Sequence, residues 1–102
     1  MSNTNPFSAV GGATVSISAT SSSGSSQADL GTQGSNVEIV NTGAEPVHVR
    51  FAATTGQAAG ATYQAIPATS RVVVTRNPAN RYVTAYAATG TNVVYFNPGD
   101  GQ

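Results

Sequence analysis

The chain has 102 residues, 8% of them charged, and its four Lys and Arg residues balance its four Asp and Glu residues, so the formal net charge is zero. A typical soluble domain has about 25% charged residues. The absence of cysteine excludes a disulfide framework and a cysteine-based metal site. The sequence also lacks the clustered Lys and Arg of a nucleic-acid-binding protein and the run of ~18 apolar residues that a membrane span requires.

The residue types favour a β protein built as one domain. Val and Thr, which fit a pleated sheet, are abundant, whereas Leu, Lys and Glu, which favour helices, are nearly missing. No window of the sequence shows a 3.6-residue apolar period. We therefore expect short strands joined by polar turns around a single modest core.

Residues 1–12 are predicted to form an extended N-terminal arm that ends at the flexible pair Gly11-Gly12. Two interpretations of this arm remain open. It is either a frayed terminus or a segment that a partner orders, with Phe7 as its anchor.

Alternating apolar and polar residues predict four strands in the first half of the chain. Their ranges are 13–20, 27–31 (a weak edge strand), 36–40 and 47–52. The serine-rich segment 21–26 is predicted to be a loop. Because a short turn at 41–45 joins the last two strands, we expect them to pair as a hairpin, with Val47, Val49 and Phe51 facing the core.

The second half of the chain contains a short strand at 62–66, a β-branched run at 70–75 that we expect to be a central strand, and a final hairpin. The hairpin joins strands 81–87 and 92–97 through Thr89-Gly90. One of its faces suits a core and carries Val83, Ala85, Val94 and Phe96. The other face is unusually aromatic for a solvent-exposed surface and carries Tyr82, Thr84, Tyr86, Val93 and Tyr95.

These elements together predict an all-β protein, an antiparallel β-sandwich of the jelly-roll or Ig-like type with seven to eight short strands and negligible helix. The sandwich domain spans residues 13–98. It lies between the arm at 1–12 and a C-terminal tail at 99–102.

The tyrosines of the final hairpin are the main candidates for a functional surface. Three interpretations of these tyrosines remain open. They pack under a loop or against the other sheet, they form a protein interface, or they form a platform on which a sugar stacks. Arg76 and Arg81 flank one loop and could pair with acidic groups on a partner. The candidate partner interface is therefore Phe7, Tyr82, Tyr86, Tyr95, Arg76 and Arg81.

The sequence offers no arrangement that is typical of catalysis. His48, the only histidine, lies on the outward side of its predicted strand beside Arg50, and there is no nucleophile-elbow motif. The four carboxylates are too widely spread for a catalytic pair or a calcium site, and no glycine-rich phosphate loop is present. We therefore predict that the protein is not an enzyme and has no catalytic, metal or cofactor site.

Three stretches of the chain resemble a family of small proteins of tailed double-stranded-DNA bacteriophages. They are the opening NPFSAV…ATVSISATSSS, the central VEIVNTGAEPVHVRFA, and the run IPATSRVVVTRNPANRYVTAYAATGTNVVYFNPGDG. Shared hallmarks are an Asn-Pro-Phe start, an Asn-Thr-Gly turn before a Val-x-Val-x-Phe strand, a Pro-x-x-Ser turn and a Gly-acid-Gly end. These motifs serve packing and turns, so no catalytic or binding residue is carried over from the family.

The resemblance implies a virion structural protein, specifically a head decoration (cement) protein that binds the outer surface of the head and stabilises contacts between capsomeres. Its partners would be the major capsid protein and further copies of itself on the shell, with no nucleic acid and no membrane. The opening MSNTNPF lacks the features of a signal peptide, so we expect synthesis in the host cytoplasm. Two alternatives remain: another virion component (a head–tail or tail accessory protein), and a carbohydrate-binding β module with weak glycan affinity.

Overall fold

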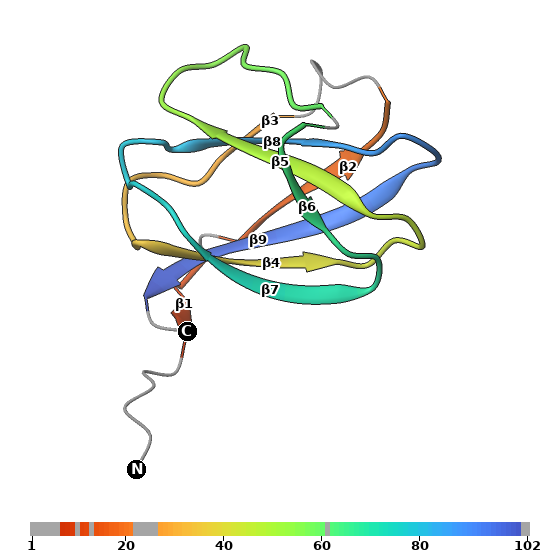
Figure 1. Cartoon of the computed structure of the whole chain (residues 1–102). Coiled ribbons are helices and arrows are strands. Elements are labelled where there is room, and N and C mark those ends of the chain that lie inside the picture. Colours follow the sequence, from red (N-terminus) through yellow and green to blue (C-terminus); the bar gives the residue numbers. More distant parts are fainter. Residues whose placement is uncertain (1–6, 10, 13, 22–26, 61, 101–102) are drawn as a thin grey trace.

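The computed structural model in Figure 1 describes residues 7–9, 11–12, 14–21, 27–60 and 62–100. Most of the predicted arm and most of the predicted serine-rich loop lie outside the described residues. Among the described residues there is no helix of the length and apolar character needed to cross a membrane.

The described residues form nine strands and no helix, so the predicted all-β class is confirmed. The strands are β1 (Ser8–Ala9), β2 (Val15–Ala19), β3 (Gln27–Asp29), β4 (Asn36–Asn41), β5 (Val47–Ala52), β6 (Gln64–Ile66), β7 (Ser70–Thr75), β8 (Tyr82–Tyr86) and β9 (Asn92–Asp100).

The strands are arranged in two antiparallel sheets that face each other, as predicted for a β-sandwich (Figure 1). The five-stranded sheet has the order β1-β9-β4-β7, and β2 also pairs with β9. The four-stranded sheet has the order β3-β8-β5-β6. β9 pairs with β4 along one edge, and with β2 and then β1 along the other. Since β9 extends to Asp100, the predicted tail at 99–102 begins inside the sheet.

The core lies between the sheets and follows the predicted alternation of apolar residues. Phe96, Ile39 and Val83 are fully buried and come from both sheets, as expected for two inward faces that interdigitate. The predicted inward positions in β2, β4, β5, β8 and β9 all belong to this cluster or pack against it.

Both predicted hairpins are wrong. β4 belongs to the five-stranded sheet and β5 to the four-stranded sheet. Likewise, β8 belongs to the four-stranded sheet and β9 to the five-stranded sheet. The turns after β4 and after β8 therefore carry the chain from one sheet to the other. Each crossing lets two consecutive amphipathic strands bury their apolar faces against each other across the core, which is how a sandwich differs from a hairpin.

A buried asparagine fastens the first crossing. Asn41 ends β4 in the inward-facing phase and is only 1% exposed. Its Nδ2 donates to the carbonyl oxygens of Glu45 (2.9 Å) and Pro67 (3.1 Å), and its Oδ1 accepts from the Gly43 N–H. These bonds hold the turn against the β6–β7 connection, so the turn is directed toward the second sheet.

A second buried asparagine joins the two crossings to each other. Asn92 begins β9, accepts from the Glu45 N–H (3.2 Å) and donates to the Thr89 carbonyl oxygen (3.2 Å). A Cβ atom at Gly43 would lie only 2.1 Å from the Asn92 Oδ1 atom, so this position requires glycine.

The prediction that residues 70–75 form a central strand is also wrong, because within the described part of the chain β7 is an edge strand that pairs with β4 alone. Val72 and Val74 are partly buried and pack against the core, and Val73 is partly buried on the opposite side of the strand. A continuous apolar run does not distinguish a strand covered on both faces from an edge strand that shares one apolar face with the core.

Candidate functional site

The predicted tyrosine-rich face is divided between the two outer surfaces of the sandwich. Tyr82 and Tyr86 lie on β8 and point out of the four-stranded sheet, because Val83 and Ala85 between them are fully buried in the core. Tyr95 lies on β9 and points out of the five-stranded sheet, on the other side of the molecule. The division follows directly from the crossing between β8 and β9.

The loop between β5 and β6 covers the outer face of the four-stranded sheet (Figure 1). The Thr84 hydroxyl donates to the Gln57 carbonyl oxygen (2.8 Å), the Arg50 guanidinium donates to the Ala58 carbonyl oxygen (3.0 Å), and His48 Nδ1 lies 3.0 Å from the Tyr63 carbonyl oxygen. Thr84 is consequently only 4% exposed, although its side chain points away from the core.

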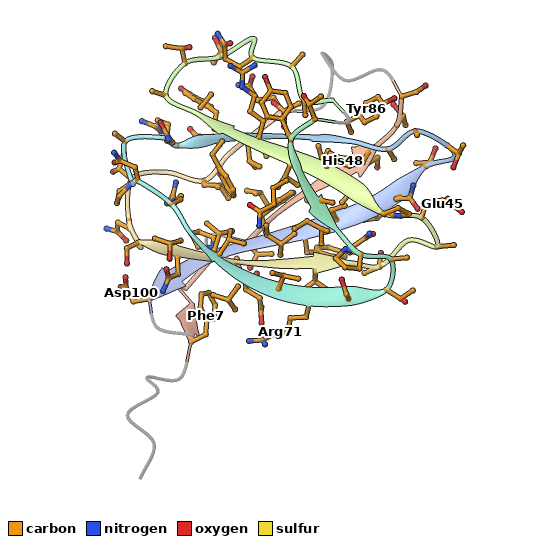
Figure 2. All side chains as sticks on the ribbon, in the orientation of Figure 1. Phe7, Glu45, His48, Arg71, Tyr86 and Asp100 are labelled. Atoms are coloured by element: carbon orange, nitrogen blue, oxygen red, sulfur yellow. The ribbon has the colours of Figure 1, made fainter. Side chains whose placement is uncertain are left out.

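Tyr86 and His48 lie side by side on this covered face, with ring centroids 6.3 Å apart (Figure 2). Tyr82 lies under the guanidinium of Arg81, 5.5 Å from its Cζ atom. Both tyrosines are half-buried. Each of these two tyrosines is therefore partly covered by a neighbouring side chain.

Arg76 is buried rather than available to a partner, since its residue is only 4% exposed. Its guanidinium donates to the carbonyl oxygens of Gly31 (2.9 Å), Asn80 (3.2 Å) and Gln33 (2.7 Å). Burial lowers the pKa of Arg76 from its usual value, and nearby Asp29 opposes that shift. The residue joins the β3–β4 and β7–β8 connections from within the protein, which corrects its predicted role in binding acidic groups.

Arg81 is engaged in an exposed ion pair within the chain. Its Nε and NH2 groups donate to the two carboxylate oxygens of Asp29, at 3.0 and 2.7 Å. The hydrogen bonds from Arg81, followed by one from the Gly31 N–H, hold the pKa of Asp29 below its usual value. The same carboxylate raises the pKa of Arg81. A partner with acidic groups would compete with Asp29 for this arginine.

The outer face of the five-stranded sheet, which we call the open face, is defined by Ser16, Ser18, Val40, Val73, Val93 and Tyr95. Tyr95 is 42% exposed and lies opposite Val40 on one side and Ser16 on the other. The three valines are half-buried. Apolar and small polar side chains therefore alternate across this surface. Among the described residues, no loop is hydrogen-bonded over it in the way that the β5–β6 loop is over the four-stranded sheet.

One row of polar side chains crosses the open face from β2 to β7. The Thr14 hydroxyl donates to the Asn97 Oδ1 atom (2.5 Å), the Asn97 Nδ2 group donates to Glu38 (2.9 Å), and the Arg71 guanidinium forms an ion pair with the same carboxylate. Among the described residues of this face, Glu38 and Arg71 are the charged ones, and they neutralise each other.

Phe7 is half-buried and precedes β1 at the end of the five-stranded sheet. In Figure 2 it lies on the same side of the molecule as Arg71, beyond the five-stranded sheet. Among the six predicted interface residues, the structure therefore places Phe7 and Tyr95 on one side, Tyr82, Tyr86 and Arg81 with the four-stranded sheet, and Arg76 in the interior.

The groups considered for catalysis are dispersed. Asp29 and Glu38 are paired with arginines, Asp100 accepts hydrogen bonds from the main chain and hydroxyl of Ser35, and Glu45 lies in the first crossing. In the described part of the chain, no group of three His, Cys, Asp or Glu residues is placed to hold a metal ion.

Sequence reasoning placed Val93 on an outward face but missed the other two valines of the open face, Val40 and Val73. Val40 follows the inward-facing Val37 and Ile39 out of phase, and Val73 interrupts the phase of Val72 and Val74. An apolar residue in the outward phase of a strand was the available signal. Assigning these residues to one surface required the order of the strands.

A comparison of the chain with protein-family models, curated proteins and solved structures finds no match.

Proposed function

We propose that this protein is a bacteriophage virion structural protein, a head decoration protein that binds the major capsid protein on the outer surface of the head. The sequence resemblance supports this proposal. The structural observation that carries it is the open face, on which an exposed Tyr95 lies among half-buried valines while the two charged groups pair with each other. Protein interfaces are enriched in aromatic residues and depleted of free charge at their centres.

The shape and charge of the chain suit repeated, non-covalent attachment to a shell. A sheet face presents its side chains on a continuous surface, and small residues such as Ser16 and Ser18 let a partner approach Tyr95 closely. The zero net charge avoids long-range repulsion between copies that dock near one another. Where several such domains associate on the shell, weak individual contacts combine into strong attachment.

The structure gives less support to a carbohydrate platform. That interpretation placed Tyr82, Tyr86 and Tyr95 on one surface, whereas two of them lie half-buried on the outer face of the four-stranded sheet and the third lies on the opposite outer face. The predicted three-tyrosine platform is therefore not formed.

Binding to undecorated heads tests the proposal. We expect the purified full chain to co-sediment with heads in a saturable manner, and we expect Tyr95→Ala to weaken binding at least tenfold, because a central aromatic anchor contributes about 2 kcal/mol or more. Tyr63→Ala is the matched control, since Tyr63 is similarly exposed (39%) but lies near the four-stranded sheet.

Two results would contradict the proposal. The wild-type chain would fail to bind heads at any concentration, or the protein would be found in the tail of purified virions. If Tyr63→Ala and Tyr95→Ala weaken binding equally, the open face is not the docking surface. A copy number comparable to that of the capsid protein would support decoration over a head–tail connector.

A further inference from the structure

The four outer edges of the two sheets differ in how well they are protected. β3 and β6 have three residues each, and Pro67 follows β6 directly. β2 has five residues, and the two sheets meet just beyond its end, where Thr20 bridges to Tyr86 and its carbonyl oxygen accepts from the Ala87 N–H (3.1 Å). The described chain leaves β7, with six residues, as its long open edge.

β7 lacks the features that usually prevent an edge strand from pairing with another chain. It contains no proline or lysine, and its register with β4 is regular from Ser70 to Thr75, without a bulge. Its one charged side chain, Arg71, leans over β4 to pair with Glu38, away from the free edge. The centre of the strand is the apolar run Val72–Val74.

Two hydrogen bonds show which main-chain groups of β7 face outward. The Arg76 N–H donates to the Ser35 carbonyl oxygen (2.8 Å), which continues the β4–β7 register, and the Thr42 N–H donates to the Val93 carbonyl oxygen (3.0 Å), which continues the β4–β9 register. Main-chain groups in an antiparallel ladder alternate in direction. Even-numbered residues of β7 therefore face β4, and the main-chain groups of Arg71, Val73 and Thr75 face the free edge.

We propose that β7 is a dimerisation edge, at which β7 of a second copy of this chain adds antiparallel across a two-fold axis at Val73. In this register Val73 lies opposite its own copy, and Arg71 lies opposite Thr75 of the second chain. The outward-facing main-chain groups of these residues then meet each other as hydrogen-bonded pairs. A slip of one residue would bring inward-facing valines opposite outward-facing ones and would misalign the two cores.

Self-complementarity identifies a second copy as the occupant of this edge. The proposed register places no like charges opposite one another, and the zero net charge of the chain adds no long-range repulsion. Val72 and Val74, which are only partly buried at this end of the core, meet each other across the new strand pair and lose exposure. A two-fold axis requires one patch to match itself, and β7 meets that condition.

The proposal goes beyond the proposed function and does not depend on it. Edge-to-edge pairing makes one continuous sheet from the five-stranded sheets of both copies and brings their open faces onto the same side. The assembly then presents two Tyr95 side chains on one surface, whatever that surface binds.

The mass of the full chain in solution tests the proposal. We expect sedimentation velocity at concentrations up to about 1 mM to show a reversible change from monomer to dimer. Val73→Pro should raise the dimer dissociation constant at least about tenfold, because proline removes an N–H that faces the free edge and leaves the ladder with β4 intact. Val73→Thr keeps that N–H and is the matched control, and circular dichroism shows that the strands persist in both variants.

A charge exchange tests the register itself. Val73→Lys and Val73→Glu should each be monomeric, because the two-fold axis sets like charges directly opposite, and an equimolar mixture should recover the dimer. If Val73→Glu alone still dimerises, Arg71 lies opposite that position and the proposed register is wrong. A wild-type chain that stays monomeric throughout, or a Val73→Pro variant that dimerises like the wild type, would overturn the proposal. If the wild-type chain is monomeric and its Val73→Pro variant loses binding to heads, the β7 edge pairs with a strand of another protein.

Discussion

Arg76 is the residue whose environment differs most from what its type suggests. Its guanidinium donates hydrogen bonds to three main-chain carbonyl oxygens, and none of these partners is a carboxylate. The planar fork of arginine suits this task, because its donors point in fixed and diverging directions. The residue therefore tethers the β3–β4 and β7–β8 connections without belonging to any strand.

We expect Arg76→Lys to lower the free energy of unfolding by about 1–3 kcal/mol, since a single ammonium group cannot reach all three carbonyl oxygens and leaves buried acceptors without donors. Urea-induced unfolding at neutral pH measures the change. Arg81→Lys is the control, because its ion pair with Asp29 is exposed to solvent and should contribute much less to stability. Equal effects of the two substitutions would refute the tethering role of Arg76.

At the scale of elements, alternation in the sequence predicted the strands and the inward-facing residues, because the apolar residues within a strand indicate which of its faces is buried. It did not predict which strands pair. A turn such as 41–45 is compatible with a hairpin or with a crossing between sheets. The crossing is held by hydrogen bonds of Asn41 and Asn92 to residues far away in the sequence, which local alternation does not reveal. The candidate surface failed for the same reason, since grouping Tyr82 with Tyr95 assumed the hairpin.

Gly43→Ala tests how the crossings are held. The added Cβ atom would overlap the Asn92 side chain and displace it from Glu45 and Thr89, so we expect a loss of about 1–3 kcal/mol in the free energy of unfolding. Gly60→Ala is the matched control, because a Cβ atom there meets no atom within 4 Å. A Gly43 variant as stable as the Gly60 variant would show that the two crossings are independent of each other.

At the scale of the whole molecule, the low charge concentrates the pH dependence of folding in few groups. The chain has four Asp and Glu residues in total, and the pKa of one of them, Asp29, is held below its usual value. Because the folded state favours ionised Asp29, its contribution to stability is present above the unfolded pKa of about 3.9 and is lost as the pH falls through the lower folded value.

We therefore expect Asp29→Asn to flatten the decline of stability below about pH 4, with the largest difference from the wild type above that pH. Thermal unfolding measured from neutral to acidic pH, at low and high salt, checks this expectation, and added salt should reduce the difference because the ion pair is exposed. A wild-type and a variant curve that stay parallel throughout would mean that Arg81 and Asp29 are not paired in solution.

β9 gives the fold an unequal response to mechanical load. It is bonded along both edges, to β4 on one side and to β2 and β1 on the other. A force directed along its axis must shear both ladders simultaneously, whereas a force that lifts β7 sideways opens a single ladder one rung after another. The sandwich should consequently resist extension through its last strand far better than peeling from its opposite margin.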